Sequence, residues 1–130
     1  MLVDDSDQSL GLTEEMLRDL GVTQIYTAQN CAQGLDMLAS FDEDDFIDAV
    51  LCDWNMPEMN GIELLRQIRR QDEKLLFIMI TGKADNSSLA EAKAVGANGF
   101  LKKPFLSDDL RKKLTVVSRI VNQRNLDSVT

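Results

Sequence analysis

Acidic, hydroxyl and lysine side chains follow short apolar runs at several points in this chain. These residues are Asp4, Asp5, Asp53, Thr81 and Lys103. In an open parallel sheet the carboxyl ends of the strands share one edge, so residues at those ends meet although they are distant in sequence. We therefore expect these side chains to form one cluster.

Phosphoryl transfer to an aspartate is the chemistry that such a cluster could perform. Three carboxylates brought together repel one another and lose hydration, and a hard divalent cation with oxygen ligands offsets that cost. Mg²⁺ is the expected ion. A carboxylate beside Mg²⁺ can attack a phosphoryl donor, while a lysine and a hydroxyl stabilise the oxygens over which charge spreads. Each residue alone favours a structural interpretation, because Asp and Thr often cap helices and lysine is usually exposed; the hypothesis depends on their joint order.

Short apolar runs, rich in Val, Ile, Leu and Phe, are predicted to be the strands that position this cluster. The predicted strands are Met1–Asp4, Gln24–Ala28, Ala49–Asp53, Leu76–Thr81 and Gly99–Lys102. Amphipathic stretches alternate with them, which is typical of a parallel sheet covered by helices on both faces. We therefore predict an α/β fold with five strands and five helices.

The ends of several helices can also be predicted. Gly21 and Gly96 follow amphipathic stretches and are expected to end the first and fourth helices. Ser107 is a natural N-cap for the last helix, because acidic residues follow it where the helix dipole favours negative charge. The apolar residues of that helix have coiled-coil spacing, but the stretch is short and core packing is the preferred interpretation. They are Leu110, Leu114, Val117 and Val121.

Length and composition fit one domain. The chain has 130 residues, 44% of them hydrophobic, and we predict a domain over 1–121 with a polar tail or linker over 122–130. No apolar run is long enough to cross a membrane and no signal peptide is visible, so the expected location is the cytoplasm, away from membranes. The net charge of −8 argues against direct nucleic-acid binding. Because the chain lacks histidine, its phosphoryl group must come from another protein or molecule.

Two further features are predicted to be structural. Cys31 and Cys52 are too few and too far apart in sequence for a disulfide framework or a zinc site, so both are expected to be small core residues. The acidic run 42–45 is expected to be a solvated loop.

Four motifs together resemble a known family. They are Asp4-Asp5, Asp53-Trp54-Asn55-Met56-Pro57 with Asn60-Gly61, Ile80-Thr81-Gly82, and Lys103-Pro104-Phe105. This set resembles the receiver domains of two-component response regulators, the single-domain chemotaxis regulators most closely, over residues 1 to about 121. The fold that the resemblance implies is flavodoxin-like: a doubly wound (βα)₅ parallel sheet with strand order 2-1-3-4-5.

The resemblance also implies the metal ligands. Asp53 would be the phosphoacceptor. Mg²⁺ would be held by Asp5, by the Asp53 carboxylate and by the main-chain carbonyl of Asn55, with Asp4 acting through water. These assignments are expectations from the family.

The switch residues come from the same resemblance. The Thr81 hydroxyl would bond the acyl phosphate, and the Lys103 ammonium would pair with another of its oxygens. Phe100 fills the position of the switch aromatic, although an apolar ring on the last strand also fits ordinary packing. A cis peptide bond is expected between Lys103 and Pro104.

The implied function is a phosphorylation-controlled switch. A histidine kinase or phosphotransfer protein would supply the phosphoryl group, and the face formed by the fourth helix, fifth strand and fifth helix would signal to a downstream protein or attached output domain. Such a domain catalyses only its own phosphoryl transfer and dephosphorylation, so we do not expect an enzyme acting on a separate substrate.

Three alternative functions fit the sequence less well. A dehalogenase-type phosphatase expects an acidic residue two places after its nucleophile, where this chain has Asn55. A receiver-fold interaction module that works without phosphorylation would be favoured if one of the acidic or lysine positions of the motifs were replaced, and all of them are filled here. FMN binding is disfavoured by the acidic residues after the first strand, which would repel a phosphate group.

Overall fold

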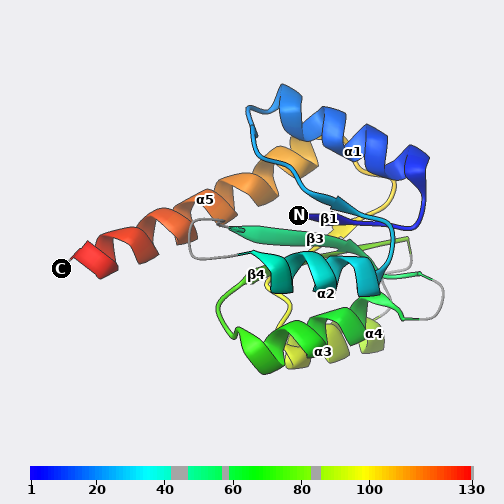
Figure 1. Cartoon of the computed structure of the whole chain (residues 1–130). Helices are drawn as coiled ribbons and strands as arrows, with labels where there is room; N and C mark the ends of the chain where they lie inside the picture. The colour runs from blue at the N-terminus through cyan, green and yellow to red at the C-terminus, as the bar shows by residue number, and fades with distance from the viewer. Residues whose placement is uncertain (42–46, 57–58, 83–85, 130) are drawn as a thin grey trace.

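The computed structural model describes residues 1–41, 47–56, 59–82 and 86–129, with side chains as far as residue 124. These residues form a parallel five-stranded sheet with helices on both faces (Figure 1). Its strand order, β2-β1-β3-β4-β5, confirms the predicted fold class and topology. The strands are β1 (Leu2–Val3), β2 (Thr27–Ala28), β3 (Ala49–Asp53), β4 (Leu76–Thr81) and β5 (Gly99–Lys102).

The helices divide between the two faces of the sheet. They are α1 (Asp7–Asp19), α2 (Cys31–Ser40), α3 (Gly61–Gln71), α4 (Asn86–Val95) and α5 (Ser107–Val129). Helices α2, α3 and α4 contribute to one apolar cluster, and α1 and α5 contribute to the other. None of the helices in the described part of the chain is long and apolar enough to span a membrane.

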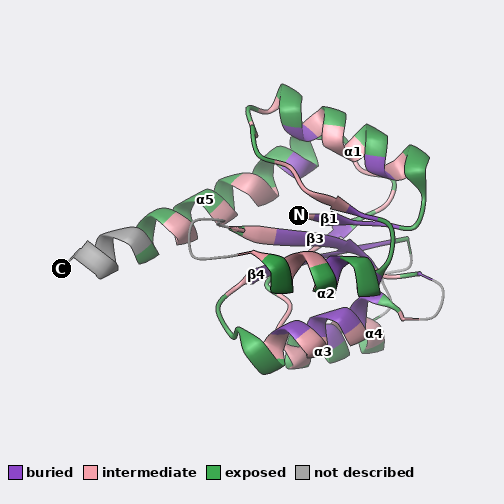
Figure 2. Cartoon of the chain, viewed as in Figure 1, coloured by how far each residue is buried: buried purple, intermediate pink, exposed green. Residues whose placement is uncertain are grey.

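Alternation along the strands explains the two clusters. In β3, Val50 and Cys52 belong to the cluster under α2, α3 and α4, whereas Leu51 between them belongs to the cluster under α1 and α5. Successive side chains of a strand point to opposite faces, so a strand buried on both faces reads as a continuous apolar run. Figure 2 shows the consequence, with buried residues along the strands and on the inner sides of the helices.

Local signals set the ends of the helices, and the two glycine stops were predicted. The side chains of Ser6, Asn30 and Asn60 accept hydrogen bonds from backbone N–H groups in the first turns of α1, α2 and α3. Gly21 and Gly96 follow α1 and α4 with φ angles of 98° and 120°, a conformation that glycine adopts without steric cost.

The first two strands are shorter than predicted. Leu2 pairs with Thr27 and Val3 pairs with Ala28. β2 lies at the edge of the sheet, and β1 is the strand beside it. A two-residue β1 therefore limits β2 to two residues, and residues 24–26 fall outside the strand. At the other end of the chain, α5 continues to Val129, so residues 122–129, predicted to be a polar tail or linker, are helical.

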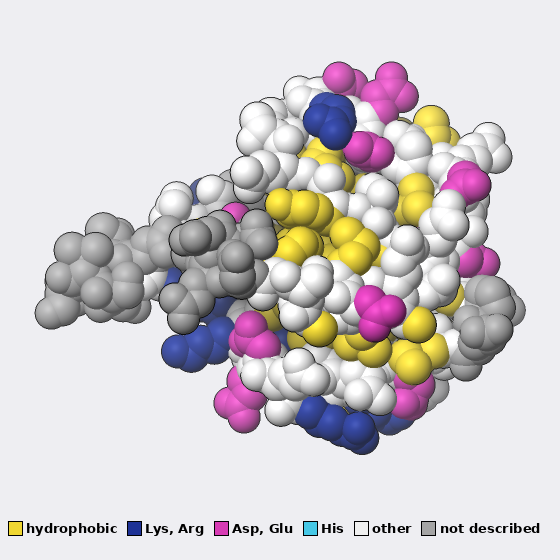
Figure 3. Space-filling model, in the orientation of Figure 1, with side chains coloured by type: hydrophobic (Ala, Val, Ile, Leu, Met, Phe, Trp, Pro, Cys, Tyr) yellow, Lys and Arg dark blue, Asp and Glu magenta, His cyan; other side chains and the backbone are white. Residues whose placement is uncertain are grey.

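The predicted core role of α5 is largely confirmed. Leu110 is fully buried, and Leu114 and Val117 pack against the same cluster. Beside them, residues of α1, α5 and the strand edge line a groove of about 700 Å³ at the amino ends of the strands. Hydrophobic side chains reach the surface over this part of the molecule (Figure 3). The acidic run 42–45 and Pro57 lie outside the described residues.

Candidate functional site

Three carboxylates meet at the carboxyl edge of the sheet. Asp4 and Asp5 follow β1, and Asp53 ends β3. One carboxylate oxygen from each lies within 4.8 Å of the others. Asp4 and Asp53 are 7% and 8% exposed, whereas Asp5 is exposed to solvent. The cluster therefore has a buried floor and an open side.

Lys103 completes this cluster from the loop after β5. Its Nζ lies 3.2 Å from Asp53 Oδ2 and 3.3 Å from Asp4 Oδ2. The backbone N–H of Lys103 also donates to the Thr81 carbonyl at 2.8 Å, which ties the loop to the end of β4. One ammonium group thus faces two carboxylates that would otherwise repel each other.

Burial and charge shift the titration of both partners. Burial, the largest effect, raises the pKa of Asp53 above its usual range; the Asp4 carboxylate adds to this, while the Lys103 ammonium opposes it. For Lys103, burial alone would lower the pKa, but Asp53 and Asp4 together raise it. The ammonium is therefore held in its charged form, and the Asp53 carboxylate is held in a site that disfavours its charge.

The backbone around Asp53 is fixed by the loop that follows it. The N–H of Trp54 donates to the Ile80 carbonyl at 2.8 Å, and the N–H of Gly61 donates to the Trp54 carbonyl at 2.9 Å. A Cβ atom at Gly61 would lie 2.7 Å from the Asp53 carbonyl oxygen and 2.8 Å from the Met79 sulfur. A residue without a side chain is thus required where α3 begins against the end of β3.

Asn55 and Thr81 lie where the sequence placed them. The N–H of Asn55 donates to Asp53 Oδ1 at 3.4 Å, so its main chain lies beside the acceptor carboxylate. Thr81 is 3% exposed and ends β4, opposite Lys102 in the sheet register. Of the five side chains predicted to converge, three carboxylates and the lysine lie together, and Thr81 ends the strand beside them.

The structure also describes the predicted switch residue Phe100 and the peptide bond before Pro104. Phe100 is half-buried and packs against the cluster under α2, α3 and α4, opposite Met79 in the register. The structure places it in ordinary packing contact, which is compatible with both interpretations of this ring. The peptide bond between Lys103 and Pro104 is cis, as the resemblance implied.

The donor set fits a hard divalent cation. Carboxylate oxygens are the ligands that Mg²⁺ prefers, and Asp4, Asp5 and Asp53 offer three of them within one small volume. Asp5 on the open side leaves room for the waters that Mg²⁺ usually keeps. Asp5, Asp53 and the Asn55 carbonyl would hold the ion, with Asp4 acting through water.

Sequence reasoning noted Gly61 only as part of a motif and missed its packing role. It also missed the close approach of Cys31 to Cys52, whose side chains pack in one buried cluster although 20 residues lie between them. Helical and strand spacing could place each cysteine on an inward face, but only the packing of α2 on the sheet brings the two together.

Comparison with known proteins agrees with this geometry. Residues 1–115 match the response regulator receiver domain. Chemotaxis protein CheY-3 of Vibrio cholerae is 39% identical over 116 residues, which cover 88% of this chain and 86% of that protein. Chemotaxis protein CheY of Pseudomonas aeruginosa is 35% identical over 124 residues, covering 94% of this chain and 97% of that protein. The solved structure of Vibrio cholerae CheY4 superposes with a TM-score of 0.80 at 31% identity, covering 89% of this chain and 94% of that one. On its motifs, its topology and these similarities, the chain belongs to the receiver domain family of response regulators.

Proposed function

We propose that this receiver domain takes a phosphoryl group onto Asp53 in a magnesium-dependent reaction. The observation that carries the proposal is the meeting of Asp4, Asp5 and Asp53 with the Lys103 ammonium, 3.2 Å from an Asp53 oxygen. Bound Mg²⁺ would neutralise charge on the carboxylates and on the incoming phosphoryl oxygens.

Asp53, Lys103 and Thr81 would have different roles in the phosphoryl transfer. An oxygen of Asp53 attacks phosphorus, a new P–O bond forms, and the bond from phosphorus to the donor breaks with its electron pair leaving on the donor. Lys103 moves from its contact with Asp53 to an oxygen of the transferred group, because that group carries more negative charge than the carboxylate it modifies. Thr81 donates its hydroxyl to another phosphoryl oxygen.

Thr81 would connect the phosphoryl group to the signalling surface. Its movement toward Asp53 would open space behind β4, into which the half-buried Phe100 ring turns. Both residues lie on neighbouring strands, β4 and β5, so the change would reach the face formed by α4, β5 and α5. Phosphorylation would then shift the population between two packings of this face.

The partners would follow from this chemistry. A histidine kinase or phosphotransfer protein donates the phosphoryl group, since this chain has no histidine. A downstream protein, or an output domain, reads the changed face. The domain catalyses only its own phosphorylation and dephosphorylation, and it would work in the cytoplasm.

Trp54 provides the test, because it directly follows Asp53 in sequence. Its fluorescence should change saturably with Mg²⁺ and again when beryllofluoride, a phosphoryl mimic, is added. Asp53→Asn should lose the beryllofluoride response and weaken the Mg²⁺ response. Glu15→Gln, an exposed acid in α1, is the matched control and should respond as the unmodified protein does. If Mg²⁺ and beryllofluoride leave Trp54 unchanged in the unmodified protein, and nuclear magnetic resonance shows no shifts at Asp53, the proposal is wrong.

A further inference from the structure

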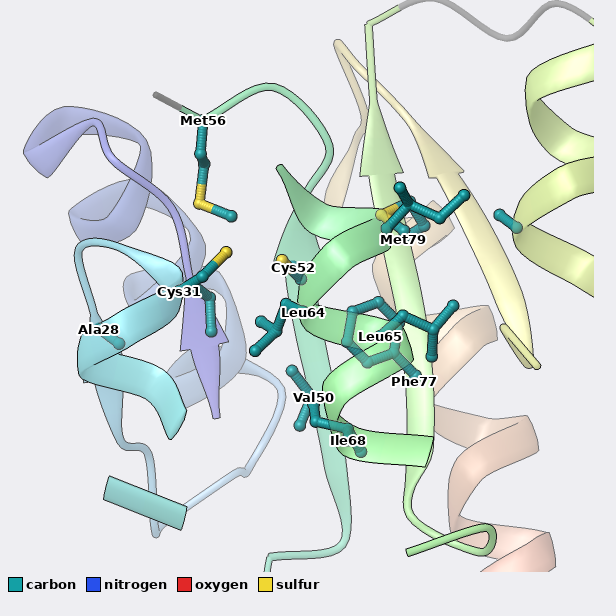
Figure 4. Close-up of a cluster of buried hydrophobic side chains, with 13 residues drawn as sticks. Ala28, Cys31, Val50, Cys52, Met56, Leu64, Leu65, Ile68, Phe77 and Met79 are labelled. Atoms are coloured by element: carbon teal, nitrogen blue, oxygen red, sulfur yellow. The ribbon is translucent and has the colours of Figure 1, made fainter. Parts of the chain in front are cut away.

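Two buried thiols face each other between α2 and β3. Cys31 is the first residue of α2 and Cys52 precedes Asp53 in β3. Both side chains belong to the buried apolar cluster under α2, α3 and α4. Figure 4 shows their sulfur atoms pointing toward one another across the space between α2 and β3.

Each thiol also contacts a backbone carbonyl near the site. The Cys31 sulfur lies 3.0 Å from the carbonyl oxygen of Met59, in the loop before α3. The Cys52 sulfur lies 3.2 Å from the carbonyl oxygen of Asp53. Both cysteines are buried, with 1% and 0% of their surfaces exposed. A bond between the two sulfurs would therefore join α2 directly to the strand end that carries Asp53.

We propose that Cys31 and Cys52 are a redox site, which a peroxide converts to an intramolecular disulfide and a thiol reductant restores. Two thiols that face each other within one buried cluster have a high effective concentration for each other, which favours a disulfide over higher oxidation of either sulfur. The chain has no other cysteine that could compete.

The reaction balances with hydrogen peroxide as the oxidant. The Cys31 thiolate attacks one peroxide oxygen, the O–O bond breaks, and hydroxide leaves, so that Cys31 becomes a sulfenic acid. The Cys52 sulfur then attacks the Cys31 sulfur, the S–O bond breaks, and water leaves. In sum, two thiols and one peroxide give one disulfide and two waters. The position of Cys31 at the start of a helix supports its role as the first nucleophile, and the neighbouring Cys52 side chain lowers the Cys31 pKa.

The bond would also affect Asp53. Drawing the Cys52 sulfur toward Cys31 breaks its contact with the Asp53 carbonyl, whose oxygen already lies close to Gly61. We expect the oxidised protein to bind Mg²⁺ several-fold more weakly than the reduced protein. This second expectation rests on the proposed function, whereas formation of the disulfide does not.

Thiol counting on the whole folded chain tests the proposal. After peroxide treatment, unfolding and alkylation, intact mass should show no alkyl groups, against two for the reduced protein, and dithiothreitol should restore both. Peptide mapping should find one cross-linked pair containing Cys31 and Cys52. In Cys31→Ser and in Cys52→Ser the remaining thiol should form no intramolecular bond, and Glu15→Gln, an exposed residue of α1, should form the disulfide as the unmodified protein does.

Each other outcome overturns the proposal. Two alkylated cysteines after prolonged peroxide treatment would show that the pair does not oxidise. Oxygen added to sulfur as sulfinic or sulfonic acid would show oxidation without pairing, and cross-linked dimers would show pairing between molecules. A failure of Asp53 phosphorylation in the same preparation would leave the thiol count unaffected, so the two proposals can fail separately.

Discussion

The side-chain ammonium of Lys103 lies 3.2 Å from a carboxylate oxygen of Asp53 and 3.3 Å from one of Asp4. Lys103 lies 50 positions after Asp53 in the sequence, and the sheet order brings them together, because β3 and β5 both flank β4. The Lys103 ammonium thus lies between two carboxylates that could also bind a divalent cation, so the two cations compete for the same negative charge.

Replacement of Lys103 should separate metal binding from phosphoryl transfer. In Lys103→Met the competing ammonium is removed, so Mg²⁺ should bind several-fold more tightly, as measured by Trp54 fluorescence. The rate of phosphorylation by acetyl phosphate should fall by about two orders of magnitude, because the transferred oxygens lose a positive partner. Lys103→Arg keeps the charge with a different geometry and should change Mg²⁺ affinity less. Equal Mg²⁺ affinity and an equal rate in Lys103→Met would contradict this role.

The raised pKa of Asp53 predicts a stability effect that depends on pH. Burial and Asp4 disfavour the ionised carboxylate in the folded state, so that cost is present above the folded-state pKa and is lost as pH falls through it. Without Mg²⁺, Asp53→Asn should therefore unfold at higher urea concentration than the unmodified protein at neutral pH. The difference should shrink on acidification as Asp53 takes up a proton. A difference that grows toward low pH would show that the sign is wrong.

Gly61 should tolerate no side chain. In Gly61→Ala the new Cβ would lie 2.7 Å from the Asp53 carbonyl oxygen, and the free energy of unfolding should fall by roughly 1–3 kcal/mol. Gly11 is the matched control, because it lies within α1 and a Cβ there meets no atom within 4 Å. Gly11→Ala should raise the free energy of unfolding by about 0.5–1 kcal/mol. Urea titration measures the free energy of unfolding of both variants. Similar changes in the two would refute the packing argument at Gly61.

Thr81 should matter for the response to phosphorylation more than for phosphorylation itself. Thr81→Ala should still gain a phosphoryl group from acetyl phosphate, because Asp53 and the carboxylates remain. The changes that phosphorylation causes at Phe100, followed by nuclear magnetic resonance, should be lost. Thr81→Ser restores the hydroxyl and should recover them. An intact response at Phe100 in Thr81→Ala would exclude Thr81 as the connecting residue.

Much of this architecture could be predicted because local signals agree with the fold. The apolar runs of β3 and β4 are buried on both faces and matched their predicted bounds. The glycines after α1 and α4 were visible as residue types. The last helix begins at Ser107, close to its predicted start, but Ser107 is its first helical residue and not its N-cap. The convergence of Asp53 with Lys103 required only the rule that parallel strands share a carboxyl edge.

The remainder depends on contacts between distant segments. The length of β2 is set by its partner β1, which sequence periodicity does not report. The need for glycine at position 61 comes from the approach of α3 to the Asp53 carbonyl. The meeting of Cys31 and Cys52 likewise depends on how α2 lies on the sheet, so their separation in sequence was a poor guide to their distance.

Intact-mass analysis after treatment with acetyl phosphate tests the central claim most directly. With Mg²⁺ present, the account predicts one added phosphoryl group, sensitive to hydroxylamine as an acyl phosphate is, and none when Mg²⁺ is chelated. Asp53→Asn should gain none under either condition, while Glu15→Gln should behave as the unmodified protein does. An unmodified mass in the presence of Mg²⁺, or a phosphoryl group that persists in Asp53→Asn, would contradict the assignment of Asp53 as the phosphoacceptor.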